Sequence, residues 1–330
     1  MIKRRALLAL FLSLVLFTPV IAQIREENIR AELGFLASDA MQGRASGSNY
    51  ERIAAEYIGS QFRQFGLEPG GDTDNAGNKG FVQHVSIESR TPGGEPRSTW
   101  NAIGILRGSD RRAASEAIMI SAHLDHIGVN EALTGDKIFN GADDDASGSV
   151  AVMELARVLA SGKRPRRTIY FICFGSEERG GHGARYFIAN SPVPLTQIVA
   201  DLNLEMLGRP DPKLPAGTLW LTGFERSTLG PELARRGANI VADPRPEQNF
   251  FQRSDNYTLA LRGVVAHTVS SFGMHTDYHR PSDDVSKIDF PFMTRSLNSL
   301  VGPVRWLANS RFRPTWLPGQ APTREGRPRS

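Results

Sequence analysis

Histidine and carboxylate side chains recur in this sequence directly after apolar segments. They are His123, Asp125 and His126 after "AIMISA", the triplet Asp143, Asp144 and Asp145, the pair Glu177 and Glu178 after "YFICFGS", Glu205 after "IVADLNL", and His275, Asp277, Tyr278, His279 and Asp283 in "HTDYHRPSD". Imidazole and carboxylate groups together are ligands of zinc and similar divalent ions. So many carboxylates without a cation would repel one another and resist desolvation. The pattern therefore indicates a divalent metal site, with a carboxylate shared between two ions at its centre.

Each of these signals also has an ordinary structural explanation. A single histidine at a strand end is more often hydrogen-bonded within the protein than bound to a metal. Paired glutamates commonly begin a solvated helix, where they interact favourably with the helix dipole, and three successive aspartates commonly form a surface turn. The joint occurrence of five such segments, each after or between apolar elements, favours the metal site.

The elements that must position these side chains alternate between strand and helix. Strands are predicted at residues 101–106, 117–123, 167–175, 197–207, 217–223 and 263–269, and helices at residues 28–38, 148–162, 182–190 and 289–310. Ser48 and Glu51 form a capping-box pattern before a further helix. The apolar run at 167–175 is typical of a strand buried on both faces. This order predicts an α/β fold with a largely parallel sheet, in which ligands bind beyond the carboxyl ends of the strands.

Five segments also match a known family. They read "SAHLDHIG", "NGADDDASG", "GSEERGGHGA", "LNLEMLGR" and "YHRPSDD", and the upstream "LASDAMQGRASGS" and "FGLEPGGD" fit as well. The sequence resembles the co-catalytic zinc aminopeptidases of metallopeptidase family twenty-eight, over nearly all of the chain to the final helix. The resemblance implies a single-domain three-layer α/β/α zinc exopeptidase fold, with a mixed, mostly parallel central sheet and two Zn²⁺ ions.

The resemblance assigns the metal ligands residue by residue. His123 and Glu205 would hold one zinc ion, Glu178 and His279 the other, and Asp144 would bridge the two. Position 205 is Glu where many members have Asp, and both side chains can bind a metal.

The resemblance also implies catalytic and supporting roles. Glu177 matches the general base, Asp125 the carboxylate that orients the ring of the first histidine ligand, and Tyr278 a tyrosine that polarises the substrate carbonyl. A cis peptide bond is implied between Asp144 and Asp145. We expect Asp143 and Asp145 to support Asp144, by hydrogen bonds or by favourable interaction with the N-terminus of the following helix.

Three residues depart from the family pattern or have no counterpart among its ligands. His126 and His182 match no ligand, which leaves them a structural or supporting role. Asn256 stands where the segment "RSDN" usually ends in histidine, so no role is carried over to that position.

A peptide substrate and N-terminal cleavage are the most direct expectation from this resemblance. Other branches offer a glutaminyl-cyclase-like acyltransferase, which works with one zinc, and a glutamate-carboxypeptidase-like hydrolase, for which Arg253 or Arg280 could hold a carboxylate. A binding protein with an inactive site is the non-enzymatic alternative. The complete ligand set and Glu177 favour hydrolysis with two metal ions, while side-chain preference and oligomeric state stay open.

Residues 1–22 have the order of a secretory signal peptide: a basic start, an apolar run and small residues ending at Ala22. Cleavage after Ala22 would place the protein in the periplasm or outside the cell, with no stable membrane span. An uncleaved anchor is the alternative, but the apolar run is shorter than the ~20 residues of a span. The chain has 39 Lys and Arg against 35 Asp and Glu. Loss of three basic residues with the signal leaves a net charge of +1, which argues against nucleic-acid binding.

The remaining sequence predicts one zinc peptidase domain at residues 23–310. The segment 311–330 is rich in proline and arginine, and we expect it to be flexible. The single cysteine, Cys173, lies in an apolar run and can form no intrachain disulfide. We therefore expect a buried and unreactive thiol.

Overall fold

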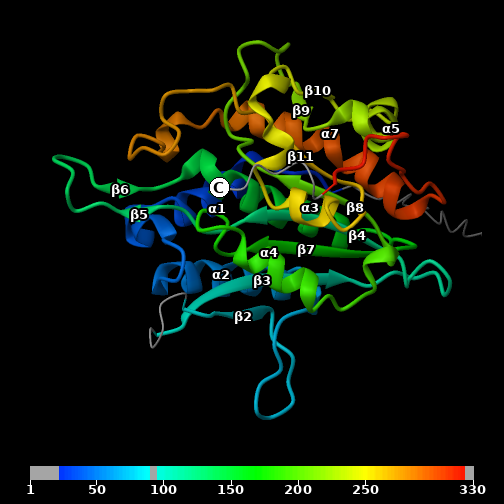
Figure 1. Ribbon diagram of the computed structural model, residues 1–330, viewed down its shortest axis with the longest axis horizontal. Coiled ribbons are helices and arrows are strands. Elements are labelled where there is room, and N and C mark those ends of the chain that lie inside the picture. The colour runs from blue at the N-terminus through cyan, green and yellow to red at the C-terminus, as the bar shows by residue number, and fades with distance from the viewer. Residues whose placement is uncertain (1–21, 90–94, 324–330) are drawn as a thin grey trace, which may run out of the picture.

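The computed structural model describes residues 22–89 and 95–323 (Figure 1). Within these ranges no helix is both long enough and apolar enough to cross a membrane. The predicted signal peptide lies, except for Ala22, outside the described residues.

A mixed nine-stranded sheet forms the centre of the molecule, in the order β1-β3-β7-β4-β8-β11-β9-β10, with β2 paired to β3. The strands are β1 (Glu68–Pro69), β2 (Val82–Ile87), β3 (Arg97–Leu106), β4 (Ala117–His123), β7 (Thr168–Phe174), β8 (Ile198–Leu204), β9 (Leu219–Leu221), β10 (Ile240–Ala242) and β11 (Ala266–Ser270). The four central strands β7, β4, β8 and β11 are parallel. Antiparallel pairs flank them, with β3 on β7 and β9 on β11. A separate short ladder joins β5 (Gly128–Val129) to β6 (Ile138–Phe139).

The parallel register brings the ends of the central strands to one edge. His123 at the end of β4 lies opposite Phe174 at the end of β7. Leu204 at the end of β8 lies opposite Val269 near the end of β11. The polar residues that follow each strand are therefore delivered to the same side of the sheet, as the sequence predicts.

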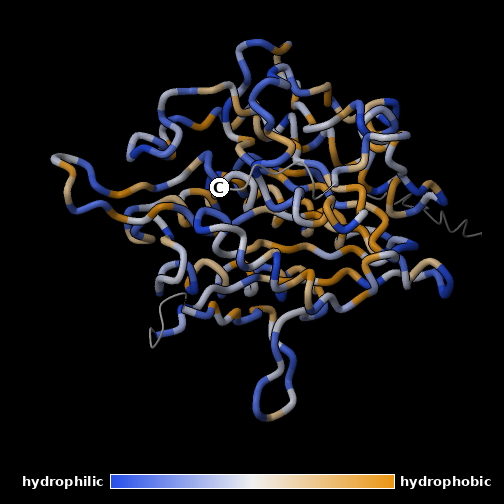
Figure 2. Tube along the Cα trace, viewed as in Figure 1, coloured by the Kyte–Doolittle hydropathy of each residue, from blue (hydrophilic) through white to orange (hydrophobic). Residues whose placement is uncertain are grey.

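Helices cover both faces of the sheet, which gives the three-layer α/β/α arrangement. They are α1 (Glu26–Leu36), α2 (Asn49–Gln64), α3 (Gly148–Ala160), α4 (His182–Ala189), α5 (Leu229–Arg235), α6 (Asn256–Ala260) and α7 (Phe290–Asn309). Helices α1, α2, α3 and α7 pack on one face, and α4 and α6 on the other. Alternate side chains of each strand enter the two cores: Ile118 and Ile120 of β4 face the first, and Met119 faces the second. Figure 2 shows the apolar residues concentrated in the central strands.

One predicted strand is clearly shorter in the structure, whereas the helix after the aspartate triplet begins where it was predicted. The strand predicted at 217–223 is reduced to β9. The helix after the aspartate triplet begins at Gly148, and a wide irregular turn at Ala142–Ser147 precedes it. Cys173 is fully buried in β7, and burial raises the pKa of its thiol to about 12. An unreactive cysteine is consistent with that environment.

The first part of the C-terminal tail packs on the domain, in contrast to the flexible segment we expected. The backbone of Thr315 accepts a hydrogen bond from the N–H of Thr228 and donates one to its hydroxyl, each at 3.0 Å. The Trp316 ring lies 5.2 Å from the ring of His267 and 6.0 Å from that of Phe251. An aromatic side chain that finds an apolar surface offsets the cost of ordering a short segment. Residues 324–330 lie outside the described part of the chain.

His267, which lies beneath Trp316, gives a test of stability against pH. Its ring is fully buried, Nδ1 donates to the carbonyl of Thr222, and Nε2 lies 2.7 Å from the hydroxyl of Ser227. Burial lowers the pKa of His267 from 6.5 to about 4. The ring is neutral in the folded protein but gains a proton in the unfolded chain below pH 6.5. The free energy of unfolding should therefore fall as the pH decreases from 6.5 to 4, by about 3 kcal/mol from this group.

Chemical unfolding of the wild type and of His267→Asn, measured between about pH 4 and pH 8, checks this expectation. The variant should be less stable at neutral pH but should lose less stability on acidification. Equal acid sensitivity in the two proteins would contradict the role given to His267.

Candidate metal centre

The five predicted metal ligands come together at the carboxyl edge of the sheet. His123 ends β4, Glu178 follows β7, Glu205 follows β8 and His279 lies in the loop after β11. Asp144 lies in the irregular turn before α3. Side chains far apart in sequence thus form one cluster, because parallel strands end at the same edge.

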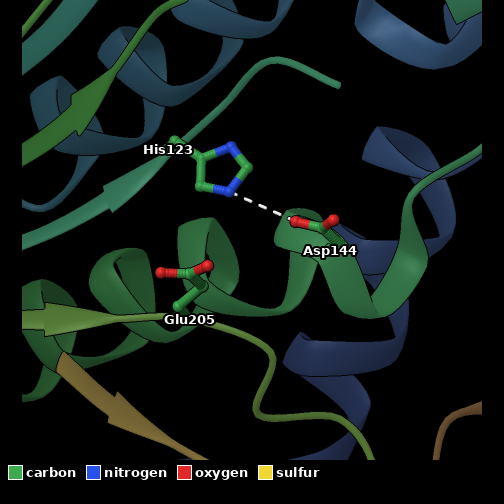
Figure 3. Close-up of side chains that lie close together, drawn as sticks. All are labelled: His123, Asp144 and Glu205. Carbon is green, nitrogen blue, oxygen red and sulfur yellow. Dashed lines mark ion pairs between the residues drawn. The ribbon is translucent and has the colours of Figure 1, made fainter. Parts of the chain in front are cut away.

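One group of ligand atoms forms around the first oxygen of Asp144. One ligand atom each of His123, Asp144 and Glu205 lie within 4.8 Å of one another. His123 Nε2 is 3.2 Å from Asp144 Oδ1. Figure 3 shows these three side chains arriving from three separate segments.

A second group forms around the other oxygen of Asp144. His279 Nε2 lies 3.1 Å from Asp144 Oδ2 and 3.2 Å from Glu178 Oε1. His126 Nδ1 lies 2.9 Å from Glu178 Oε1 and 3.8 Å from Asp144 Oδ2. The two oxygens of Asp144 therefore face two different sets of ligands, which is the arrangement of a carboxylate that bridges two ions. His126, for which we expected a structural or supporting role, is part of the cluster.

The residues of the cluster fit divalent cations because several of their buried polar atoms have no hydrogen-bond partner. Buried atoms without a hydrogen-bond partner include both ring nitrogens of His126, Asp144 Oδ2, Glu178 Oε1 and His279 Nε2. An unsatisfied buried polar atom costs about 1–3 kcal/mol. Apart from Nε2 of His126, these atoms lie within ion-pair distance of one another but lack hydrogen-bond geometry, which suits ligands that share an ion. Bound cations would satisfy all of them except Nε2 of His126, and the mixture of imidazole and carboxylate suits zinc.

Electrostatics support the same assignment. Burial on its own would raise the pKa of Asp144, but the imidazoles of His123, His279 and His126 hold it well below its ordinary value. Burial would lower the pKa of His123, but the surrounding carboxylates raise it well above its ordinary value. Burial raises the pKa of Glu177 well above that of a free carboxyl group, and neighbouring carboxylates raise it further. Positive charge is thus favoured throughout the cluster.

The aspartates on either side of Asp144 hold the backbone. Asp145 Oδ2 accepts the N–H of His123 at 3.2 Å, and Asp145 Oδ1 accepts those of Gly148 and Met206 at 3.0 Å each. Asp143 Oδ1 accepts the N–H of Gly208 at 2.7 Å. These bonds tie the turn to the ends of β4 and β8 and to the start of α3. The supporting role expected for the outer aspartates is confirmed.

A further carboxyl group supports the turn from the C-terminal half of the chain. Asp283 accepts the N–H groups of Asp143 and Asp144, each at 3.1 Å to one of its oxygens. The peptide bond between Asp144 and Asp145 is cis, as the resemblance implies.

Asp125 links His123 to Glu177. The ring nitrogen Nδ1 of His123 lies 3.1 Å from the backbone carbonyl of Asp125 and 3.8 Å from its carboxylate. The carboxylate oxygen Oδ1 accepts the N–H of Glu177 at 2.9 Å. The imidazole of His123 thus donates to the backbone carbonyl of Asp125, and not to its carboxylate as expected; the carboxylate instead fixes the backbone of Glu177.

Glu51 holds the turn that precedes Glu177. Its N–H is capped by the hydroxyl of Ser48, as the capping-box pattern predicts. Its carboxylate does not return to the cap residue but accepts the N–H groups of Gly47 and Ser176, at 2.7 and 3.0 Å. Burial raises the pKa of Glu51 to about 8. Ser176 has a φ of +61°, a region that non-glycine residues adopt infrequently and that is common at functional sites.

Arg44 is a supporting residue that the sequence analysis missed. It is fully buried, and its guanidinium donates to the carbonyls of Leu124, Asn140 and Gly141 at 2.9, 2.7 and 3.0 Å. It therefore fixes the loop after His123 relative to the aspartate turn. In the sequence, Arg44 is marked only by the preceding Gly43 in the "GR" pair. The structure shows why this glycine is needed: a Cβ there would lie 2.4 Å from the carbonyl oxygen of Phe139, so the chain packs closely without a side chain.

A pocket open to solvent lies beside the cluster. Aromatic rings and Arg253 line it together with Glu205; the rings belong to Trp220, Phe250, Phe272 and Tyr278. The Tyr278 ring also stacks on that of His279, with centroids 3.9 Å apart. Tyr278 thus lies between the pocket and the cluster.

The model of Peptidase family M28 matches residues 101–301, which include every residue of the cluster. The chain therefore belongs to this family of peptidases.

Sequence relatives carry related descriptions. The chain is 29% identical over 193 residues to a probable zinc metalloprotease of Pyrenophora teres f. teres, an alignment that covers 57% of this chain and 38% of the relative. It is 28% identical over 316 residues to leucine aminopeptidase 1 of Trichophyton equinum, with 88% of this chain and 76% of the relative covered. The chain spans about two fifths of the length of the first of these relatives.

Solved structures share the fold. The aminopeptidase from Aneurinibacillus sp. strain AM-1 aligns with a TM-score of 0.66 at 16% identity and covers 88% of this chain and 96% of its own. The glutaminyl cyclase of Porphyromonas gingivalis aligns with a TM-score of 0.63 at 18% identity, over 86% and 99% of the two chains. The observed α/β/α architecture with its parallel sheet centre is thus that of known aminopeptidases.

Proposed function

We propose that this protein is a dinuclear zinc exopeptidase, and specifically an aminopeptidase that removes N-terminal residues from peptides. The observation that carries the proposal is the division of Asp144 between two ligand sets, one with His123 and Glu205 and the other with Glu178 and His279. The family membership and the leucine aminopeptidase relative support it.

Zinc ions held by these residues would supply Lewis acidity and lower the pKa of bound water toward about 7. Glu177 is buried beside the cluster, and its backbone is fixed by Asp125. Its carboxylate takes the proton of the attacking water and returns it to the leaving amine, which is general acid–base catalysis. Tyr278 donates a hydrogen bond to the substrate carbonyl oxygen as negative charge develops there.

The excess of carboxylates at the cluster suits the ammonium group of a free N-terminus. The adjacent pocket, with its aromatic walls, suits the side chain of the first residue. Together these features explain removal of residues from the N-terminal end of a peptide and not from its interior.

A screen of chromogenic aminoacyl substrates before chelation, after chelation and after return of zinc tests this proposal. Hydrolysis should be lost on chelation and restored by zinc. γ-Glutamyl and acidic dipeptide substrates test the carboxypeptidase alternative, and an N-terminal glutaminyl peptide tests the cyclase. Cyclisation without hydrolysis, or hydrolysis that survives complete metal removal, would contradict the aminopeptidase.

The proposal includes export to the periplasm or the medium. The basic and apolar order of residues 1–22 supports it. Mass spectrometry of protein recovered from its native host should give an N-terminus at Gln23. We further propose that residues 23–310 form the catalytic domain.

A further inference from the structure

His126 has no part in the ligand set assigned above, yet its imidazole reaches the same point in space. The ring is 1% exposed, and neither nitrogen has a hydrogen-bond partner. Nδ1 lies 2.9 Å from Glu178 Oε1 without hydrogen-bond geometry. A buried imidazole that serves only as structure normally satisfies at least one nitrogen, as His267 does with Thr222 and Ser227.

The surrounding chain fixes the backbone of His126 and leaves space for its ring. The backbone N–H of His126 donates to the carbonyl of Arg44 at 3.1 Å, and His126 forms an isolated parallel β-bridge with Ala45. A Cβ at Gly141 would lie 2.6 Å from ring carbons of His126, so this glycine leaves the space that the ring occupies. The position of Nδ1 is therefore set by the surrounding backbone.

The known distances around this point are close to those between the ligands of one zinc ion. Zinc held at about 2.0–2.2 Å by each donor separates tetrahedral ligand atoms by roughly 3.3–3.6 Å. His126 Nδ1 lies 2.9 and 3.8 Å from the oxygens of Glu178 and Asp144, and His279 Nε2 lies 3.2 and 3.1 Å from the same two oxygens. The four separations fall on both sides of the ideal value.

We propose that His126 is a ligand of the ion that Glu178 and His279 hold, which gives that ion four protein ligands with Asp144. The inference rests on the proposed dinuclear zinc centre. The other ion, at His123, Asp144 and Glu205, has three. Four protein ligands are typical of zinc that is retained for structure, and three of zinc that keeps a position open for water or substrate. The two ions should therefore bind in two steps, with the His126 side filled first and emptied last.

Nuclear magnetic resonance of the full protein, labelled with ¹⁵N and loaded with ¹¹³Cd²⁺ in place of zinc, counts the imidazole ligands directly. Ring nitrogens of His123, His126 and His279 should each show one-bond coupling to cadmium. Coupling at His123 and His279 alone would overturn the proposal. This measurement uses the wild type, so it does not depend on the folding of any variant.

Zinc titration of the metal-free protein against a competing chelator gives a second readout. His126→Asn retains an amide that can donate to Glu178 but does not replace an imidazole as ligand. We expect the tighter of the two zinc dissociation constants to weaken by more than about 100-fold, because loss of a residue that only orients a ligand costs about 10–100-fold. The control is His84→Asn, which alters a surface imidazole whose partner is Ser98.

The outcomes separate this inference from the proposed function. A small loss in His126→Asn, with two-step binding preserved, would overturn the ligand role while two zinc ions and peptide hydrolysis still stand. A wild-type protein that binds neither zinc nor cadmium would overturn the dinuclear centre, and the role of His126 with it.

Discussion

Asp144→Asn should lose both peptide hydrolysis and the ability to hold two zinc ions. The two oxygens of Asp144 face separate ligand sets, with His123 Nε2 3.2 Å from one and His279 Nε2 3.1 Å from the other. An amide offers one oxygen and no charge, so it cannot serve both sets. We expect kcat/KM to fall by at least about 10⁴-fold, because the metal chemistry and the water that Glu177 would deprotonate are lost together.

Metal analysis of the dialysed protein and kinetics with an aminoacyl substrate measure this effect. Asparagine preserves the volume of the side chain, and circular dichroism reports whether the fold is retained. Asp136→Asn, an exposed aspartate on a loop, is the matched control and should keep both ions and full activity. Two tightly bound zinc ions in Asp144→Asn would refute the bridging role.

Glu177→Ala should keep its metal and lose most of its turnover. The carboxyl of Glu177 is absent from both groups of convergent ligand atoms, whereas Glu178 belongs to the group of His126 and Asp144. Removal of a general base costs about 10²–10⁴-fold in rate. We expect kcat to decrease by this factor, with zinc content unchanged.

The neighbouring glutamate provides the contrast. Glu178→Ala removes an oxygen that lies within 3.2 Å of both His126 and His279. It should lose metal from that side, and excess zinc should partly restore its activity, whereas added zinc should not rescue Glu177→Ala. Normal hydrolysis by Glu177→Ala would contradict the role of Glu177 as general base. Equal metal loss in the two variants would show that Glu177 acts as a ligand.

The sequence indicated a metal site at one edge of the sheet because of the way this sheet is built, and the family resemblance assigned the individual ligands. Strands buried on both faces read as continuous apolar runs, so their ends are marked by the first polar residue. His123 ends β4, and Glu178 and Glu205 come within four residues after the ends of β7 and β8. The rule is not strict, because β8 itself contains the buried polar residues Asp201 and Asn203. Parallel strands then bring those ends to one edge, so local pattern and topology together predict the site.

The ends of short elements were less predictable. The strand β9 is shorter than the predicted strand because tertiary pairing sets its limits: β9 pairs with only part of β11. The tail around Trp316 reads as proline-rich and polar, and the surface formed by His267 and Phe251 that receives it exists only in the folded protein.

The sequence by itself determined the chemical types at this centre, namely two imidazoles, three carboxylates and an adjacent glutamate, and the strands that carry them. Only the tertiary structure decided how they divide between the two oxygens of Asp144 and which other side chains reach the same points. His126 has the same residue type and nearly the same position as His123, three residues apart in "HLDH". Its contact with Glu178 depends on a loop held by the buried Arg44, and on space that Gly141 leaves for the ring. Those contacts join segments far apart in the chain, so no local pattern could contain them.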